Sequence, residues 1–378
     1  MWRVAGICFD HFHMGDLLRM VHDHPDAEIV AVCDERPERM EEARRNFAIP
    51  PDRVYSETEP CLVETKPDLV ILCPAAARHA EWVERVAPSG AAILVEKPFA
   101  ASLVEADRMV AAMERTGKPL AINWPLAWYA SHVRCHGLIR EGAVGEVLEV
   151  HYHDGNRGPL WHGADKIERE PTDEEKAASW FYRESEGGGS LRDYLGYGTT
   201  LATWFNGGRR PLEVMAMWDR CPGGSLEVDE HSITVARYET GMSKFETRWG
   251  TISDPWTEQP EPKCGFVVVG SEGSISSWDY DDHVTLRTRA NPRGGRIPAP
   301  APVFPGSNPV AYVLDCLEQG REIEGPLSVA VSRIGQEIVD AAVDSARTGR
   351  VVQLSLTPSH PPTLTQSEHR AASGFEKE

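Results

Sequence analysis

The sequence lacks long apolar runs, and this absence restricts the kinds of protein it can encode. No segment approaches the ~18 consecutive apolar residues that a membrane-spanning helix needs. Residues 1–3 lead directly into a predicted strand, so we expect neither a signal peptide nor a membrane anchor. A membrane is therefore not an expected partner.

Closely spaced cysteines are also absent. The chain has 8 cysteines, and no two of them form a C-x-x-C pair. Isolated thiols within apolar strands behave as small hydrophobic side chains rather than as metal ligands. This usage favours a reduced protein in the cytoplasm.

Clusters of positive charge are missing as well. Lys and Arg number 39 against 58 Asp and Glu, which gives a formal net charge of -19 that is spread along the chain. Nucleic acids and anionic membranes bind clustered Lys and Arg, so this charge disfavours both as partners. A small-molecule ligand fits the composition better.

The first third of the chain alternates apolar strands with helices. We predict strands at residues 3–9, 27–33, 68–73, 92–95 and 120–123, with helices at 17–24, 36–47, 79–87 and 103–116. Near-continuous apolar strands alternating with helices are typical of a parallel sheet covered on both faces. Residues 1–122 are therefore predicted to form a Rossmann-like, doubly wound α/β domain that binds a dinucleotide.

The pattern changes after residue 123. Alternating polar and apolar positions predict strands at residues 146–153, 212–218, 232–239, 243–251, 265–269, 273–278 and 283–289, with helices at 131–141 and 328–348. Residues 123–356 are therefore predicted to form an α+β domain with a large, mainly antiparallel sheet, used for substrate binding and oligomerisation. The segment 154–189 is long enough to form a lid or a substrate wall, residues 291–309 are predicted to be a loop, and residues 357–378 a disordered tail.

The strand at 92–95 delivers Glu96, Lys97 and Pro98 to its carboxyl end. In open α/β sheets ligands bind at that edge, so Lys97 is a candidate for chemistry as well as for an ordinary solvated strand end. Glu96 could orient the ammonium group or merely solvate the turn. Pro98 stiffens the turn, and its peptide bond can be cis.

Five segments together resemble one enzyme family. They are Glu96-Lys97-Pro98, Pro74 with His79-Ala80-Glu81, and residues 141–146 (EGAVGE), 187–193 (GGGSLRD) and 270–273 (GSEG). In this order they resemble the Gfo/Idh/MocA oxidoreductases, the family of glucose-fructose oxidoreductase and inositol dehydrogenase. The resemblance implies a Rossmann domain, a sheet domain, a nicotinamide between them, and a dimer or tetramer.

The resemblance also implies the residues that handle the proton. Lys97 would take up or donate it, with Asp193 as the orienting carboxylate or, alternatively, a helix cap. The family usually has histidine four residues after that aspartate, whereas this chain has Tyr197, which some members resembling glucose-fructose oxidoreductase share. A phenol costs about 4 kcal/mol to ionise at neutral pH, so we expect the Lys97 ammonium to lower that cost. Tyr197 could instead simply pack on a helix face.

Asp34 ends the second predicted strand and marks the cofactor. An acidic residue there binds the ribose hydroxyls, which favours NAD over NADP, although Asp34 could also cap the helix that follows. We assign eight residues to cofactor binding: Phe9, Asp10, His13, Asp34, Pro74, His79, Glu96 and Pro98.

The glycine fingerprint G-x-G-x-x-G is absent from the segment that follows the first predicted strand. We call this segment, residues 6–16, the first turn. The three glycine places of the fingerprint fall on Cys8, Asp10 and His13. An Asp10 carboxylate within ~5 Å of a phosphate would repel it by about 3 kcal/mol at an effective dielectric constant of ~20. Protonated His11 and His13 could offset that charge. These residues match no closed zinc pattern, so we expect no metal.

Polar and aromatic side chains suited to a hydroxyl-rich substrate follow later strands. We assign substrate contacts to Asn123, Trp124, His153, Asn156, Arg157 and Trp180. The sequence thus favours an NAD(H)-dependent oxidoreductase acting on a secondary hydroxyl of a sugar, cyclitol or glycoside. An NAD-assisted lyase, epimerase or glycosidase, and a non-redox binding or sensor protein, remain open alternatives.

Overall fold

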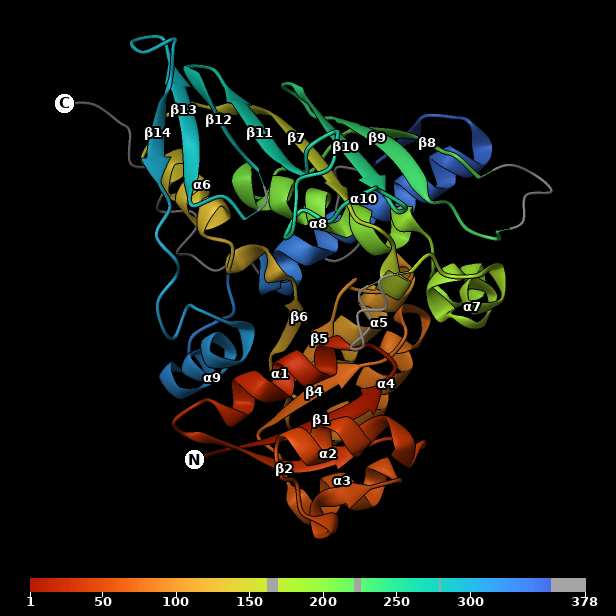
Figure 1. Cartoon of the computed structure of the whole chain (residues 1–378). Coiled ribbons are helices and arrows are strands. Elements are labelled where there is room, and N and C mark those ends of the chain that lie inside the picture. The colour runs from red at the N-terminus through yellow and green to blue at the C-terminus, as the bar shows by residue number, and fades with distance from the viewer. Residues whose placement is uncertain (162–168, 221–225, 279, 355–378) are drawn as a thin grey trace.

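A computed structural model of the chain describes residues 1–161, 169–220, 226–278 and 280–354 (Figure 1). The predicted tail at residues 357–378 lies outside these ranges. In the part of the chain that the structure describes, no helix is long and apolar enough to cross a membrane. The cysteines of the same ranges form no disulfide. A cytoplasmic location stays a prediction.

The first sheet is parallel, as predicted. Its order is β3-β2-β1-β4-β5-β6, the doubly wound arrangement of dinucleotide-binding domains. Its strands are β1 (Trp2–Phe9), β2 (Ala27–Cys33), β3 (Val54–Tyr55), β4 (Leu69–Cys73), β5 (Ala92–Glu96) and β6 (Leu120–Asn123). Its helices are α1 (His13–His22), α2 (Glu41–Asn46), α3 (Thr58–Thr65), α4 (His79–Val86) and α5 (Leu103–Glu114). The strand interiors are wholly buried because helices cover both faces.

The second sheet has nine strands and is mainly antiparallel. Its order is β14-β13-β12-β11-β7-β10-β9-β8-β15, and only the described pair β7 and β10 is parallel. The strands are β7 (Val147–Gly155), β8 (Glu213–Trp218), β9 (His231–Arg237), β10 (Met242–Arg248), β11 (Gly265–Gly270), β12 (Gly273–Trp278), β13 (His283–Thr288), β14 (Gly295–Pro298) and β15 (Val352–Gln353). The helices are α6 (Ala130–Arg140), α7 (Asp173–Ala178), α8 (Ser190–Phe205), α9 (Pro309–Gln319) and α10 (Val329–Thr348). The expected α/β fold class is confirmed.

Helices α8 and α10 lie on one face of the second sheet and between the two sheets (Figure 1). Buried side chains run without interruption from β5 through Trp124 and α8 to Phe245 on β10. The carboxyl end of the first sheet therefore meets the buried face of the second. The predicted division between residues 122 and 123 falls one residue before the end of β6, and the domain boundaries stay a prediction.

Several elements differ from the predicted pattern. Helix α1 begins at His13, four residues before the predicted start, and β14 lies within the region predicted to be a loop. Helix α9 returns to the first domain, where Val313 and Leu314 pack into its core. No helix was predicted at α9, although its buried residues Val310, Val313 and Leu314 have helical spacing; α9 packs against α1, which is distant in the sequence.

Candidate active site

A buried ion pair joins the two halves of the chain at the carboxyl end of β5. Lys97 follows β5 directly, and its Nζ lies 2.6 Å from Oδ1 of Asp193 in the first turn of α8. Their side chains are only 4% and 3% exposed. Neither charge can be solvated by bulk water, so each depends on the other. The Lys97-Pro98 peptide bond is cis.

The glycine-rich segment before α8 fixes the position of Asp193. Gly189 has a φ of 107°, and a Cβ there would lie 2.6 Å from the Asp229 carboxylate, so only glycine fits. Asp229 accepts hydrogen bonds from Ser190 Oγ and Leu191 N, both at 2.8 Å, and thereby caps the helix. Burial raises the pKa of Asp229 to about 6. Sequence reasoning missed this support because Asp229 precedes a distant strand.

Glu96 forms a second buried network beside Lys97. Its Oε2 accepts a hydrogen bond from Asn123 Nδ2 at 2.7 Å, and its Oε1 lies 2.8 Å from His13 Nδ1. Burial raises the pKa of Glu96, but the His13 ring, Lys97 and Asn123 outweigh it and hold this pKa below its usual value. The carboxylate therefore stays ionised. The structure thus brings together three residues that the sequence assigned to the cofactor or the substrate.

Tyr197 lies close to Lys97 but is not a readily ionised phenol. The Lys97 Nζ is 5.6 Å from the Tyr197 ring centroid and 6.0 Å from that of Tyr194. Burial, together with Tyr194 and Asp193, raises the pKa of Tyr197 well above its ordinary value. The expectation that the lysine lowers the net cost of ionisation is therefore wrong. Tyr197 can still donate a hydrogen bond as a neutral hydroxyl.

Asp154 was not among the residues assigned to the site. It lies near the end of β7, and its Oδ2 accepts a hydrogen bond from Tyr152 at 2.7 Å. Burial and the Asp193 carboxylate raise the pKa of Asp154 to about 7, against the opposing effects of Tyr152 and Lys97. Side chains two residues apart in a strand point to the same face of the sheet. Tyr152 packs against α8, so Asp154 also lies on the face that carries α8 and Asp193.

Asp34 binds backbone groups of two different segments. Its Oδ2 accepts from Phe9 N at 2.7 Å, and its Oδ1 accepts from Arg36 N at 2.8 Å. The carboxylate therefore links the ends of β1 and β2 and caps the turn that follows. Ribose binding by its remaining lone pairs stays a prediction.

Asp10 occupies the second glycine place but is not an uncompensated charge. Its carboxylate contacts Arg39 and lies 3.7 Å from Arg36 and 3.6 Å from Arg78. Although burial raises its pKa, the hydrogen bonds from Arg39 and Ala75 N lower the pKa of Asp10 overall. Arginines, not protonated histidines, therefore compensate this charge.

The two histidines of the same turn have other roles. Burial, with His13 and Lys97 nearby, holds the pKa of His11 well below its ordinary value, so this ring is neutral. His13 pairs with Glu96 instead of Asp10. The expectation that protonated His11 and His13 offset Asp10 is wrong.

His79 is a buried link between backbone segments. Its Nδ1 lies 3.1 Å from the Phe99 carbonyl oxygen, and its Nε2 lies 3.2 Å from that of Pro74. The ring thus connects the turns after β4 and β5 close to Pro98. These contacts make His79 a support of the cofactor edge rather than an open ligand.

Two residues assigned to the substrate point elsewhere. Trp124 is 1% exposed and packs against Gly196 and edge-on to Tyr197, with ring centroids 5.0 Å apart. It supports α8 from within the core. His153 pairs with Glu246 at 3.4 Å, on the sheet face opposite α8, because successive side chains of a strand alternate in direction. The assignment of His153 to the substrate is therefore wrong.

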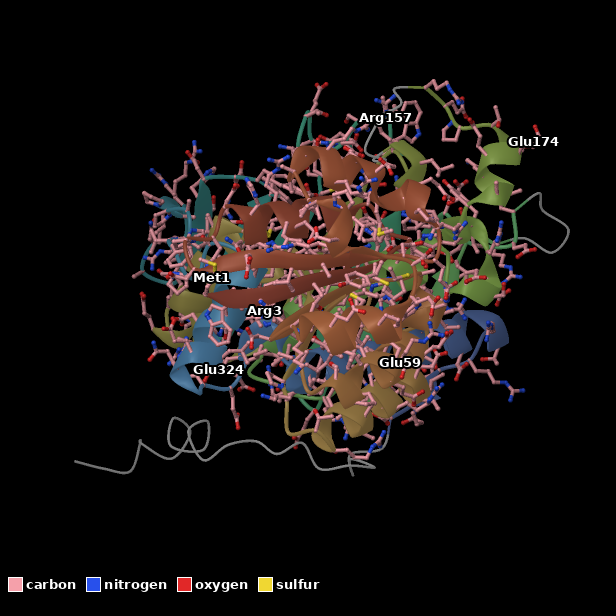
Figure 2. All side chains as sticks on the ribbon, turned by 90° about the horizontal axis from the view of Figure 1, so that it is seen from below. Met1, Arg3, Glu59, Arg157, Glu174 and Glu324 are labelled. Atoms are coloured by element: carbon pink, nitrogen blue, oxygen red, sulfur yellow. The ribbon has the colours of Figure 1, made fainter. Side chains whose placement is uncertain are left out.

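The segment after β7 forms an aromatic wall over the first domain. Asn156 Nδ2 donates to the Tyr194 hydroxyl, and the Arg157 guanidinium lies 3.7 Å from the Trp161 ring centroid. Trp180 stacks on Phe181 with centroids 3.8 Å apart, and both rings lie near His11. Arg157 and Glu174 both lie on the side of the molecule away from Met1 (Figure 2). Trp180 and Phe181 therefore lie beside the first turn. That residues 154–189 form a lid or a substrate wall stays a prediction, and residues 162–168 fall outside the described ranges.

One group near the first turn has the residue types of a metal site. His11, His13 and Glu96 each place one ligand atom within 4.8 Å of the others. However, His13 N donates to His11 Nδ1 at 3.2 Å, which places the proton of the neutral ring on Nε2, and Glu96 already pairs with His13. A metal would have to disrupt these bonds. The expected absence of a metal stays a prediction.

Two family models match the chain. Residues 6–124 match the oxidoreductase family model described as an NAD-binding Rossmann fold, and residues 132–276 match the GFO/IDH/MocA C-terminal domain. D-apiose dehydrogenase of Paraburkholderia graminis is 37% identical over 123 residues, covering 32% of this chain and 32% of that protein. Inositol 2-dehydrogenase of Salmonella typhimurium is 24% identical over 136 residues, covering 36% of this chain and 40% of that protein. The matched segments thus span about a third of these relatives.

Solved structures share the whole fold. The aldose-aldose oxidoreductase from Caulobacter crescentus complexed with glycerol has a TM-score of 0.75 at 19% identity and covers 94% of this chain and 100% of that one. The WlbA dehydrogenase from Bordetella pertussis, in complex with NADH and UDP-GlcNAcA, has a TM-score of 0.72 at 18% identity and covers 94% and 99%. At these identities the likeness shows the fold.

The raised pKa of Asp154 predicts a pH-dependent stability. From about pH 4 to about pH 7 the folded state holds a proton that the unfolded chain has released, so the free energy of unfolding falls as pH rises. Asp154→Asn removes this dependence. In urea titrations the difference in the free energy of unfolding between Asp154→Asn and wild type should change by roughly 2 to 4 kcal/mol across this pH range. The exposed Asp52→Asn serves as control, and a pH-independent difference for Asp154→Asn would contradict the raised pKa.

Proposed function

Because the chain belongs to the Gfo/Idh/MocA oxidoreductase family, we propose that it transfers hydride between NAD(H) and a secondary hydroxyl of a sugar, cyclitol or glycoside. The observation that carries the proposal is the buried pair of Lys97 and Asp193 between the two sheets. The names of the relatives, which include D-apiose and inositol dehydrogenases, support the substrate class. Asp34 favours NAD over NADP.

The described residues fit a dinucleotide at the carboxyl ends of β1, β2, β4 and β5. Asp34 would hold the ribose, and Glu96, Pro98 and His13 would border the nicotinamide end. When bound, the nicotinamide supplies the hydride acceptor or donor. The residues of the chain must then bind the substrate hydroxyl, exclude water and move one proton.

Lys97 is the residue that we assign to that proton. In reduction its ammonium donates to the oxygen on which negative charge develops; in oxidation the neutral amine accepts the hydroxyl proton. Asp193 at 2.6 Å stabilises the ammonium form and fixes its direction. Tyr197, whose ring centroid lies 5.6 Å from the same nitrogen, would contribute a neutral hydroxyl donor.

A non-redox binding protein is the second candidate. One observation favours it: Cys8, Asp10 and His13 stand where glycines let a dinucleotide approach the backbone. Fluorescence titration with NADH and NADPH separates the two functions. Failure of both to bind at millimolar concentration would exclude the oxidoreductase.

Lys97→Ala should abolish turnover while leaving NADH affinity within about twofold, because the lysine acts on the proton rather than on the dinucleotide; a loss of roughly 1000-fold in kcat is expected. Turnover is measured on a panel that includes D-apiose and inositol. Since this variant leaves Asp193 buried without its cation, Lys97→Met combined with Asp193→Asn checks that inactivity is not unfolding. The exposed Lys118→Ala is the control. An active Lys97→Ala enzyme would refute the assigned role.

Tyr197→Phe should lower kcat by about 10- to 100-fold without changing NADH affinity or the melting temperature, because only a neutral hydrogen-bond donor is lost. The alkaline limb of the pH profile should stay in place, since the phenol does not ionise in this range. Tyr312→Phe removes a hydroxyl on α9 that accepts a hydrogen bond from Glu324 N, and is the matched control. Wild-type kcat in Tyr197→Phe would exclude the role of the hydroxyl.

We further propose a homo-oligomer, a dimer or tetramer, that pairs the open faces of the second sheet. Met215, Met217, Ile233 and Met242 are 48%, 70%, 43% and 54% exposed on adjacent strands of that face. Such an apolar patch is usually covered by a partner. Met217→Lys with Ile233→Lys should lower the mass measured by light scattering, whereas Ile252→Lys, at an exposed apolar residue outside the sheet, should not. A monomeric wild type at micromolar concentration would contradict the proposal.

A further inference from the structure

Three arginines from two segments converge on the first turn. Asp10 follows β1, and its carboxylate contacts Arg39 after β2 and lies 3.7 Å from Arg36 and 3.6 Å from Arg78, which precedes α4. The Asp10 side chain is 7% exposed, whereas those of Arg36, Arg78 and Arg39 are 59%, 33% and 27% exposed. The Asp10 carboxylate is thus buried, whereas the guanidinium groups are partly exposed to solvent and accessible to a ligand.

The usual backbone donors for a phosphate are already occupied. At the start of α1, His13 N donates to His11 Nδ1 at 3.2 Å, Met14 N to the His11 carbonyl at 3.3 Å, and Gly15 N to the Phe12 carbonyl at 3.2 Å. Cys8 has a φ of 63°, so it adopts the left-handed conformation of the first glycine, but its side chain occupies space that glycine leaves open. A helix N-terminus that has used these N–H groups offers a phosphate only a weak site.

Each arginine of the cluster has a carboxylate partner. Asp34 lies 3.9 Å from Arg39, and Glu81 lies 3.7 Å from Arg78. Three carboxylates therefore face three guanidinium groups, and Asp10 is the one that all three arginines share. The planar guanidinium fork suits phosphate oxygens and binds them with charge-assisted hydrogen bonds.

We propose that Arg36, Arg39 and Arg78 bind the pyrophosphate of the dinucleotide through their side chains, in place of the glycine-loop amides. In the protein without a bound dinucleotide, the Asp10 carboxylate holds the guanidinium groups in position. When the dinucleotide binds, its phosphates replace Asp10 as partners of these groups. The proposal rests on the dinucleotide binding of the proposed function. It explains how the protein can bind a dinucleotide although side chains replace the glycines of the first turn.

Arg78 and Arg85 provide a matched pair for the test. Both guanidinium groups lie over the Trp82 ring, at 5.3 Å and 4.6 Å from its centroid, and both pair with Glu81. Among the described contacts, only that of Arg78 reaches Asp10, while Arg85 pairs with Glu35. Arg78 at the N-cap of α4 and Arg85 within α4 therefore have similar surroundings and differ in their access to the first turn.

Calorimetric titration of the full-length protein with ADP-ribose, adenosine, NADH and NADPH measures the effect. Arg78→Ala should weaken ADP-ribose and NADH binding by about 10- to 100-fold, with adenosine changed less than about twofold and Arg85→Ala near wild type for all ligands. Equal effects of the two variants would overturn the proposal. A loss confined to NADPH would also overturn it, because the arginine would then bind the 2′-phosphate.

Asp10→Asn tests the cluster without removing an arginine. Releasing the guanidinium groups from their internal anion should tighten ADP-ribose binding and steepen its salt dependence; weaker binding in this folded variant would overturn the role of Asp10. If the protein binds ADP-ribose but transfers no hydride, the oxidoreductase proposal is refuted and the arginine site is retained. If the Arg78→Ala enzyme is active and its NADH affinity is unchanged, the arginine site is refuted and the oxidoreductase proposal stands.

Discussion

The ion pair between Lys97 and Asp193 is the interaction on which the rest of the site depends. Two charges that are almost fully buried gain little net stability from each other, but removing one partner leaves the other uncompensated and costs about 3 to 5 kcal/mol. The pair therefore fixes how β5 and α8 meet. The three glycines before α8, the Asp229 cap and the packing of Trp124 on Gly196 bring Asp193 to that meeting point.

The buried polar groups around this pair differ in whether they are ionised, and this difference decides which of them can exchange a proton. Glu96 has His13 and Asn123 as partners and stays ionised. Asp154 shares its surroundings with an ammonium that Asp193 already neutralises, so it holds its proton up to about pH 7. The phenol of Tyr197 stays neutral because burial penalises its anion. These neighbours support our proposal that Lys97 is the group that exchanges a proton with the substrate.

The first turn shows how a fold can keep its path while changing the residues that support it. Cys8 retains the left-handed backbone that glycine usually supplies, and Asp34 ties β1 to β2 by accepting from Phe9 N. Asp10 brings a negative charge to a place where phosphates bind, and arginines from neighbouring turns surround it. This arrangement underlies our proposal that side-chain donors replace backbone donors at the cofactor edge.

The sequence by itself determined the parallel first sheet, the mainly antiparallel second sheet and the candidacy of Lys97, Asp193 and Asp34. The two sheets, Lys97 and Asp34 follow from local periodicity and from the rule that strand ends carry the ligand-binding side chains, whereas the candidacy of Asp193 follows from the family resemblance of residues 187–193. Only the tertiary structure decided that His153 faces away from α8, that Trp124 is core, that Asp154 joins the site and that arginines compensate Asp10. Burial, side-chain direction and the sum of neighbouring charges depend on segments far apart in the chain, and no local pattern records them.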